Sequence, residues 1–180
     1  DTEVLVKAAL DRAEEGSSIL DLCTGSGCII ISMYKEKVIK GTGTDISNSA
    51  LKVAAENAGK LGAHCSWIKS DMFDSVLGKY DMIVSNPPYI KTAVIDTLDK
   101  NVKDHEPLSA LDGGEDGLRF YRAIAAEAKA YLKRGGEIFL EIGYDQGEAV
   151  CALLMKEGYK NVEVSKDLAG LDRVVKADFY

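Results

Sequence analysis

The residues best suited to chemistry form a short run, Asn86-Pro87-Pro88-Tyr89, directly after the apolar stretch YDMIVS. Proline has no N–H group and fixes its own backbone angle, so the carbonyl groups of this run are rigid acceptors. Together with the side-chain oxygen of Asn86 they could accept both hydrogens of a planar NH₂ group, and Tyr89 could stack on the flat group that carries it. The run predicts a binding site for an amide or aromatic amine nitrogen; a structural double-proline turn is the alternative.

Such a nitrogen is a poor nucleophile because its lone pair is delocalised. Holding its hydrogens out of the π plane directs electron density at an electrophile, so orientation and pre-organised dipoles would supply the catalysis without a strong base. We therefore assign no proton transfer to the acids and the histidine nearby. His105 and Glu106 are interpreted as loop anchors or substrate-facing contacts, and Glu141 and Asp145 as groups that fix the edge of the site.

A second run, DLCTGSG, places glycines where a strand turns into a helix. Glycine allows a positive φ and close approach of a ligand, and the start of the helix offers free N–H groups and a partial positive charge. The expected ligand is anionic or zwitterionic, although a purely structural turn would also explain the glycines. A dinucleotide fingerprint requires a third small residue three positions on, and Ile30 at that position weighs against NAD.

Two further acidic positions follow later strands. Asp45 ends the second predicted strand and could accept hydrogen bonds from both hydroxyls of a ribose, or could merely cap the next helix. Asp71 and Met72 follow the third strand, where a doubly wound sheet offers another ligand contact. Asp71 could accept from an adenine amino group and Met72 could lie against the ring; a helix cap and a core methionine are the alternatives.

Short apolar runs alternate with amphipathic, helix-length segments, which predicts an α/β fold with a mainly parallel sheet covered by helices on both faces. The expected strands span residues 18–23, 38–45, 64–69, 80–85, 136–142, 162–165 and 173–177. The expected helices span residues 2–13, 28–35, 47–60, 117–133 and 146–157, with a long loop at 91–116 that holds a short helix near 94–98. The last two strands should form an antiparallel hairpin at one edge, because their connection is too short for a parallel crossover.

Composition sets the remaining bounds. The 180 residues carry 22 basic and 29 acidic side chains, a net charge of −7, which argues against a bulk nucleic-acid footprint and leaves only a local patch such as Lys129, Lys133 and Arg134. No apolar stretch reaches membrane length and residues 1–20 do not resemble a signal peptide, so we expect a cytoplasmic protein without membrane contact. The four cysteines form no Cys-x-x-Cys pair, and we expect no metal site and no disulfide framework.

At this point a family resemblance becomes clear. DLCTGSG, TDIS, SDMF and NPPYI, in this order, resemble class I S-adenosylmethionine-dependent methyltransferases that act on planar nitrogen, with their Rossmann-like, doubly wound seven-stranded sheet. HEPLSALDGGEDGLRFYRAI and GGEIFLEIGYDQGEAV are similar to stretches typical of the HemK/PrmC family, which methylates the glutamine amide nitrogen of the Gly-Gly-Gln motif in class-one peptide chain release factors. The resemblance covers nearly the whole chain.

The resemblance implies a role for each motif. The run Cys23, Thr24, Gly25, Ser26 and Gly27 would wrap the methionine end of S-adenosylmethionine, Asp45 would bind its ribose, and Met72, often tryptophan in this family, would lie by the adenine. Asn86 to Tyr89 would hold the substrate glutamine, with Asn86 also beside the cofactor. The expected product of the cofactor is S-adenosylhomocysteine.

The same resemblance implies the organisation and partners. Residues 1–180 would form a single catalytic domain, without the helical N-terminal domain of the family, and would act as a monomer on a release factor with no direct nucleic-acid binding. Methylation of an adenine or guanine amine in DNA or RNA is the alternative, and the net charge of −7 favours the protein amide over it. A non-catalytic partner that keeps the fold, and a nicotinamide-dependent oxidoreductase, rank below both.

Overall fold

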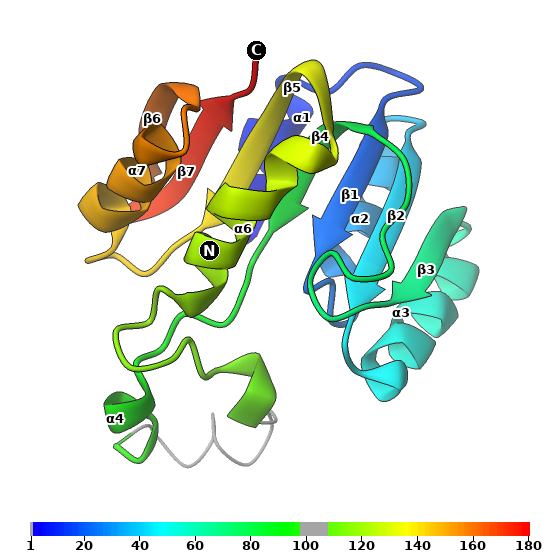
Figure 1. Ribbon diagram of the computed structural model, residues 1–180. Coiled ribbons are helices and arrows are strands. Elements are labelled where there is room, and N and C mark those ends of the chain that lie inside the picture. The colour runs from blue at the N-terminus through cyan, green and yellow to red at the C-terminus, as the bar shows by residue number, and fades with distance from the viewer. Residues whose placement is uncertain (1, 98–107) are drawn as a thin grey trace.

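A computed structural model describes residues 2–97 and 108–180, and the described residues form a seven-stranded sheet in the order β3-β2-β1-β4-β5-β7-β6 (Figure 1). The strands are β1 (Ser18–Leu22), β2 (Lys40–Asp45), β3 (Cys65–Lys69), β4 (Tyr80–Ser85), β5 (Leu132–Glu141), β6 (Lys160–Lys166) and β7 (Asp172–Asp178). The helices are α1 (Thr2–Leu10), α2 (Cys28–Glu36), α3 (Asn48–Leu61), α4 (Thr92–Ile95), α6 (Arg119–Glu127) and α7 (Gly147–Lys156), with short 3₁₀ turns at Leu108–Ala110 and Ala128–Ala130.

Strand pairing confirms the predicted α/β architecture. The pairs β1–β2, β1–β4, β2–β3 and β4–β5 are parallel, whereas β7 pairs antiparallel with both β5 and β6. The last two strands therefore form the expected antiparallel hairpin at one edge of the sheet. None of the helices in the described part of the chain is both long enough and apolar enough to cross a membrane.

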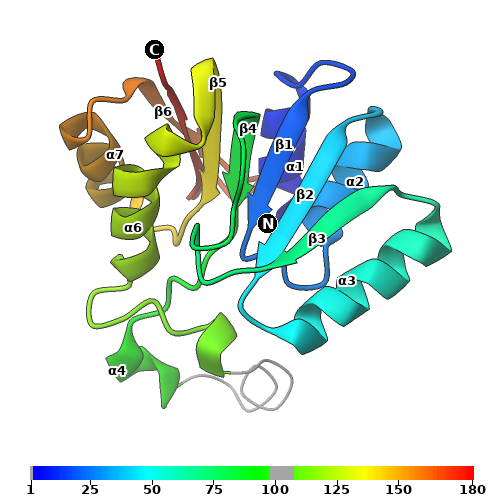
Figure 2. The ribbon, with the colours of Figure 1, turned by 45° about the vertical axis from the view of Figure 1, so that its right-hand side comes forward.

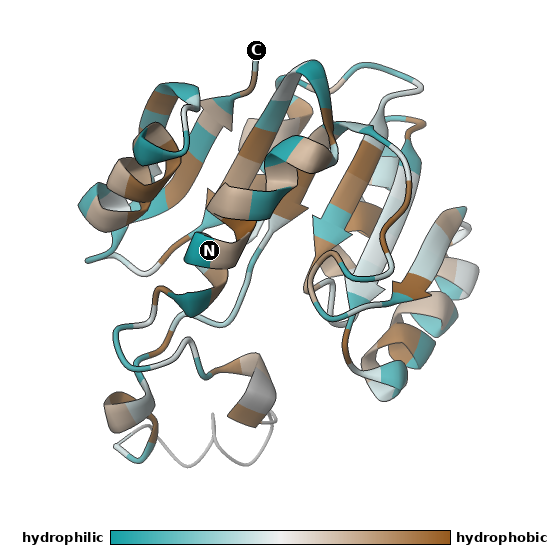
Figure 3. Cartoon of the chain, in the orientation of Figure 1, coloured by the Kyte–Doolittle hydropathy of each residue, from teal (hydrophilic) through white to brown (hydrophobic). Residues whose placement is uncertain are grey.

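The sheet separates two hydrophobic cores, with α1, α2 and α3 on one face and α6 and α7 on the other (Figures 1 and 2). Neighbouring strand residues serve different cores, because successive side chains point to opposite faces. On β1, Ile19 packs with α1 and α2, and Leu20 packs with α6 and α7. This burial on both faces explains the apolar runs of the central strands β1, β4 and β5, and hydrophobic colour runs along the centre of the sheet in Figure 3.

Helix α2 packs closely against β2 because a large residue of the helix lies opposite a glycine of the strand. Ile30 is fully buried where a dinucleotide-binding turn would place a small residue on the helix. A Cβ atom on Gly41 of β2 would lie 2.7 Å from Cγ1 of Ile30, so here the strand carries the glycine that allows the approach. This contact explains a glycine in the interior of a strand.

Four predicted elements differ from the structure by three or more residues at one end. The strand predicted over 136–142 begins earlier, at Leu132, as β5. The helix predicted over 117–133 is wrong at its C-terminus: α6 ends at Glu127, because Leu132 is buried and pairs with Tyr80 as the first residue of β5. The helix predicted over 2–13 ends at Leu10, where Lys37 Nζ donates to the carbonyls of Leu10 and Ala13. In the long loop, α4 begins two residues before the predicted 94–98, and residue 98 lies outside the described residues.

Candidate active site

The predicted site residues gather at the edge of the sheet where the parallel strands end (Figure 2). Leu22, the last residue of β1, lies opposite Thr44 of β2 and Ser85 of β4, and Asp45 lies opposite Lys69 of β3. The Ser85 hydroxyl donates to the Leu22 carbonyl at 2.8 Å. The segments after β1, β2, β3 and β4, which the sequence marks as DLCTGSG, TDIS, SDMF and NPPY, therefore begin side by side.

Gly25 and Gly27, in the turn after β1, have different structural roles. Both have positive φ, 55° at Gly25 and 79° at Gly27, and the Gly27 N–H donates to the Thr24 carbonyl at 2.9 Å. A side chain on Gly25 would meet nothing within 4 Å, whereas a Cβ on Gly27 would lie 2.8 Å from the ring of Trp67. Gly25 therefore leaves open space for a ligand, and Gly27 makes room for Trp67, which is partly buried and packs against the core.

Asp45, at the end of β2, is hydrogen-bonded to the glycine turn that follows β1. Its Oδ2 accepts from the Gly25 N–H and its Oδ1 from the Ser47 N–H, each at 2.9 Å. Ser47, the residue before α3, caps that helix by accepting from the Ala50 N–H. Because each carboxylate oxygen has a further lone pair, these contacts still allow Asp45 to accept from two hydroxyl groups of a ligand. The structural and the ligand-binding interpretation of Asp45 are thus compatible.

Asp21 is a candidate site residue that the sequence interpretation did not single out. It is fully buried on β1 beneath the glycine turn, and its Oδ2 accepts from the Thr24 hydroxyl at 2.5 Å. Its Oδ1 has no hydrogen-bond partner among the described residues. Burial raises the pKa of Asp21 to about 7. The available signal was an acidic residue inside an otherwise apolar strand, SILDL.

Cys23 and Met72 meet across the site, with Sγ and Sδ 3.9 Å apart. Both have a left-handed backbone, with φ of 56° and 44°, which is rare for residues other than glycine and is concentrated at functional sites. Burial raises the pKa of the Cys23 thiol to about 12, so this thiol stays protonated and is no nucleophile. Asp71, beside Met72, is exposed at the same edge.

The run after β4 presents acceptors. Pro87 and Pro88 are buried, and Asn86 and Tyr89 are half-buried. The Asn86 Nδ2 donates to the Thr2 hydroxyl at 3.4 Å, and the Asn86 side chain contributes to lowering the pKa of Glu141. Within residues 2–97 and 108–180, the Asn86 Oδ1 and the carbonyls of Pro87 and Pro88 accept no hydrogen bond. The Asn86 side-chain nitrogen therefore donates within the chain, while the side-chain oxygen remains available to accept a hydrogen bond from a ligand.

Glu141 stands next to this run at the end of β5. Its side chain is buried, its Oε2 lacks a partner among the described residues, and its pKa is raised by burial, partly offset by Thr2, Arg173 and Asn86. Its carbonyl accepts from the Tyr121 hydroxyl at 2.8 Å. Asp145, by contrast, lies at the rim, exposed and 3.9 Å from Lys91. That both acids fix the edge of the site stays a prediction.

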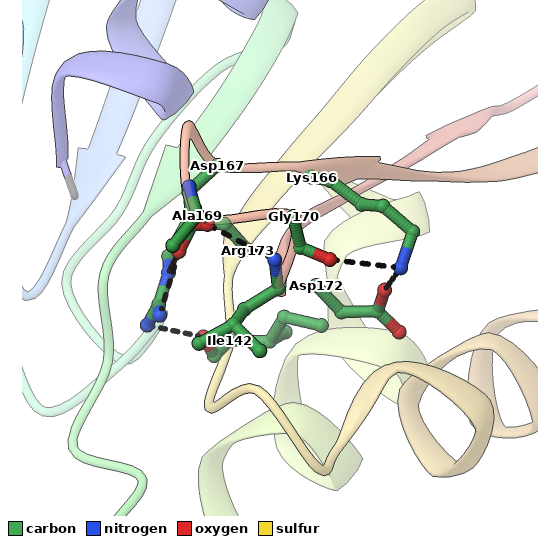
Figure 4. A network of polar contacts seen from close by, with 8 residues as sticks. Ile142, Lys166, Asp167, Ala169, Gly170, Asp172 and Arg173 are labelled. Atoms are coloured by element: carbon green, nitrogen blue, oxygen red, sulfur yellow. Dashed lines mark hydrogen bonds and ion pairs between the residues drawn. The ribbon is translucent and has the colours of Figure 1, made fainter.

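The edge hairpin holds the end of β5 in place (Figure 4). Arg173 at the start of β7 donates to the carbonyl of Ile142 at 3.3 Å and pairs with Asp167 at 3.0 Å. Asp167 also accepts from the N–H groups of Ala169 and Leu171, which closes the turn between β6 and β7. This network therefore holds Ile142, the residue that directly follows Glu141.

Other sequence-marked residues lie elsewhere. Lys129 pairs with Glu157 and Lys133 with Asp81, at the opposite edge of the sheet from the glycine turn, so the predicted basic patch is not part of this site. His105 and Glu106 lie outside the described residues. Across the described ranges, no three His, Cys, Asp or Glu side chains come together as a metal site would require.

Comparison with known proteins decides the family. A family model described as the methyltransferase small domain matches residues 1–103. The chain belongs to this family. It is also similar to the release factor glutamine methyltransferase of Agrobacterium fabrum, with 44% identity over 184 residues that cover 97% of this chain and 64% of that protein. The resemblance to the HemK/PrmC methyltransferases is thereby confirmed.

Solved structures agree with this family. The protein-(glutamine-N5) methyltransferase (release factor-specific) of Alicyclobacillus acidocaldarius is 30% identical, with a TM-score of 0.60, and the match covers 99% of this chain and 91% of that one. A methyltransferase from Pyrococcus furiosus, with 20% identity and a TM-score of 0.74 over 98% of this chain and 80% of that one, shows the same fold. The chain spans about two thirds or slightly less of the length of the curated methyltransferases that it matches.

Proposed function

We propose that this methyltransferase domain transfers a methyl group from S-adenosylmethionine to N5, the side-chain amide nitrogen, of the glutamine in the Gly-Gly-Gln motif of class-one peptide chain release factors. The observation that carries the proposal is the Asn86 amide, whose nitrogen is turned toward Thr2 and Glu141 while its oxygen is left as an acceptor. The names of the similar, longer relatives support the choice of substrate.

The residues at the strand ends fit S-adenosylmethionine. Gly25 leaves open space at the start of α2, and the unpartnered Oδ1 of buried Asp21 lies beneath that turn. An ammonium group would compensate this oxygen, and the ligand carries one on its methionine end. Asp45 retains acceptor capacity for ribose hydroxyls, and Met72 offers an apolar surface for a planar base. Bound there, S-adenosylmethionine would supply a methyl group that is electrophilic because it sits on a sulfonium.

The chain's own part in the reaction is to hold and orient the acceptor. The Asn86 oxygen and a proline carbonyl would each accept one hydrogen of the glutamine NH₂ group, which fixes the nitrogen lone pair in one direction. These dipoles are already in place before the substrate binds, because Pro87 and Pro88 are rigid and buried. As the N–C bond forms, the bond between the methyl carbon and the sulfonium sulfur would break and its electron pair would stay on sulfur, giving S-adenosylhomocysteine. The methylated amide nitrogen is then strongly acidic, so its proton can leave to water and no strong base is needed.

The state of Asp21 predicts a pH effect on cofactor binding. With a pKa of about 7, Asp21 is mostly protonated near pH 6, and a bound ammonium group would lower that pKa. Binding should then release a proton, and cofactor affinity should rise as the pH increases toward 7. Calorimetry at about pH 6 in buffers of different ionisation enthalpy measures this release. Asp21→Asn keeps an acceptor for Thr24 and should abolish the release; a wild-type protein that releases no proton would contradict the assignment.

The choice of acceptor is tested by offering several candidate acceptors in parallel reactions. The chain is incubated with methyl-labelled S-adenosylmethionine and either a release factor, the same factor with its Gly-Gly-Gln glutamine changed to alanine, duplex DNA or ribosomal RNA. We expect label in the unmodified release factor alone. Label in nucleic acid would favour a base amine as the acceptor, and equal label in both release factors would move the reaction away from this glutamine.

A further inference from the structure

Two sequence stretches that the proposed reaction leaves unexplained meet at the backbone of Tyr89. The stretch DGGEDG, residues 112–117, pairs with the segment after the proline run: the Ile90 N–H donates to the Leu111 carbonyl at 3.0 Å, and the Gly113 N–H donates to the Ile90 carbonyl at 2.8 Å. The stretch GYDQGE, residues 143–148, follows β5 and leads into α7, and it contributes Gln146. Both stretches therefore contact the backbone at the end of the proline run or directly after it.

Gln146 joins three loops through one side chain. Its Nε2 donates to the Tyr89 carbonyl at 3.0 Å and to the Gly117 carbonyl at 3.2 Å, and its Oε1 accepts from the Gly143 N–H at 2.9 Å. The residue is 5% exposed. Both amide hydrogens and the amide oxygen are therefore used, and removing the amide would take one hydrogen-bond donor away from each of the Tyr89 and Gly117 carbonyl groups.

Glycine residues let the loop come this close. A Cβ on Gly113 would lie 2.7 Å from Cα of Tyr89, and a Cβ on Gly117, where φ is 76°, would collide with the Tyr89 carbonyl oxygen. The Tyr89 backbone therefore packs directly against the backbone of the two glycines, and Gln146 donates a hydrogen bond to the Tyr89 carbonyl.

Tyr89 needs this support because the rigidity of the proline run stops before it. Proline fixes φ at positions 87 and 88, but Tyr89 is an ordinary residue whose backbone angles are free unless its neighbours hold them. A stacking ring must be held as accurately as the carbonyls that accept the NH₂ hydrogens, since small displacements of a bound acceptor lower the rate strongly.

We infer that Gln146 is a positioning residue for the acceptor amide: its NH₂ group holds the Tyr89 carbonyl against Gly113 and Gly117 and so fixes the side chain that packs on the glutamine. The inference rests on the proposed function for its kinetic consequence, while the hold on the loop is a property of the chain alone. The part that acts on Tyr89 is the donor, and the acceptor oxygen serves only Gly143.

Two substitutions separate these parts. Gln146→Met keeps the volume and removes all three hydrogen bonds, whereas Gln146→Glu keeps an acceptor for Gly143 and removes both donors. Glutamate also suits the start of a helix, so a role limited to the start of α7 would leave Gln146→Glu close to the wild type. The matched control is Lys129→Met, which removes two hydrogen bonds to Glu157 at the other end of α7.

The test combines kinetics with amide hydrogen exchange of the substrate-free chain. Both Gln146 variants should lower kcat for release factor by about 10- to 100-fold, leave the Kd for S-adenosylmethionine unchanged, and speed exchange at the Ile90 and Gly113 amides; Lys129→Met should do none of this. A Gln146→Glu protein with wild-type kcat and exchange overturns the inference, as does a parallel loss of cofactor affinity. A wild-type chain that methylates no release factor would defeat the proposed function, and the exchange rates would still decide whether Gln146 holds the loop.

Discussion

Replacing Asn86 with alanine should lower kcat for methyl transfer to the release factor by about 100- to 1,000-fold while the Kd for S-adenosylmethionine changes little. The Asn86 oxygen has no partner among the described residues, and its nitrogen is directed at Thr2 and Glu141. Without this oxygen, one hydrogen of the acceptor NH₂ group is no longer fixed and the nitrogen lone pair loses its direction. Steady-state kinetics at saturating cofactor and a calorimetric titration separate the two effects.

The control for this variant is Asn161→Gly on the edge strand β6. It removes the same amide from a residue that contacts Asp178, and glycine suits the positive φ of 48° at this position. Its kcat should match the wild type. Equal losses of kcat and cofactor affinity in Asn86→Ala would show that Asn86 mainly holds the cofactor, contrary to the role proposed for it.

Replacing Asp45 with alanine should have the opposite signature, raising the Kd for S-adenosylmethionine by about 10- to 100-fold with a smaller effect on kcat at saturation. Two losses combine in this variant. The carboxylate no longer accepts from ligand hydroxyls, and the Gly25 N–H loses the partner that holds the glycine turn against β2.

Calorimetry of Asp45→Ala beside Asp74→Ala isolates the carboxylate contacts from the loss of charge. Asp74 is an exposed acid after β3 whose removal changes the net charge equally. The Kd of the Asp74→Ala protein for S-adenosylmethionine should stay near the wild-type value. An Asp45→Ala protein with unchanged cofactor affinity would remove Asp45 from the binding site and leave it as the cap of the segment before α3.

The parts of the fold that the sequence predicts well are those fixed by local pattern. Strand β4 matches its predicted range at both ends, because an apolar run of strand length stops at two prolines. The end of α6 was missed because it depends on a distant contact: the Tyr80 N–H donates to the Tyr131 carbonyl and Leu132 joins the sheet. An amphipathic pattern that continues to residue 133 contains no local sign of that pairing.

In the candidate site too, local patterns predict the positions of the residues, whereas distant contacts could not be predicted. The turn residues Cys23 to Gly27, Asp45, and the proline run could be placed at one edge from their positions after parallel strands. The partners that hold them could not. Gln146 reaches Tyr89 across 57 positions of sequence, and the unpaired oxygen of Asp21 depends on how completely β1 is buried. Such contacts arise from packing, and a sequence pattern does not encode their geometry.

We propose that the carboxyl ends of the parallel strands present a glutamine amide nitrogen to the methyl donor. The most direct measurement is tandem mass spectrometry of a release factor after incubation with the chain and S-adenosylmethionine, with Asn86→Ala and Asn161→Gly in parallel. We expect the mass of one added methyl group on the side chain of the Gly-Gly-Gln glutamine, at wild-type level with Asn161→Gly and strongly reduced with Asn86→Ala. A methyl group on any other residue, or full methylation by Asn86→Ala, would contradict the proposal.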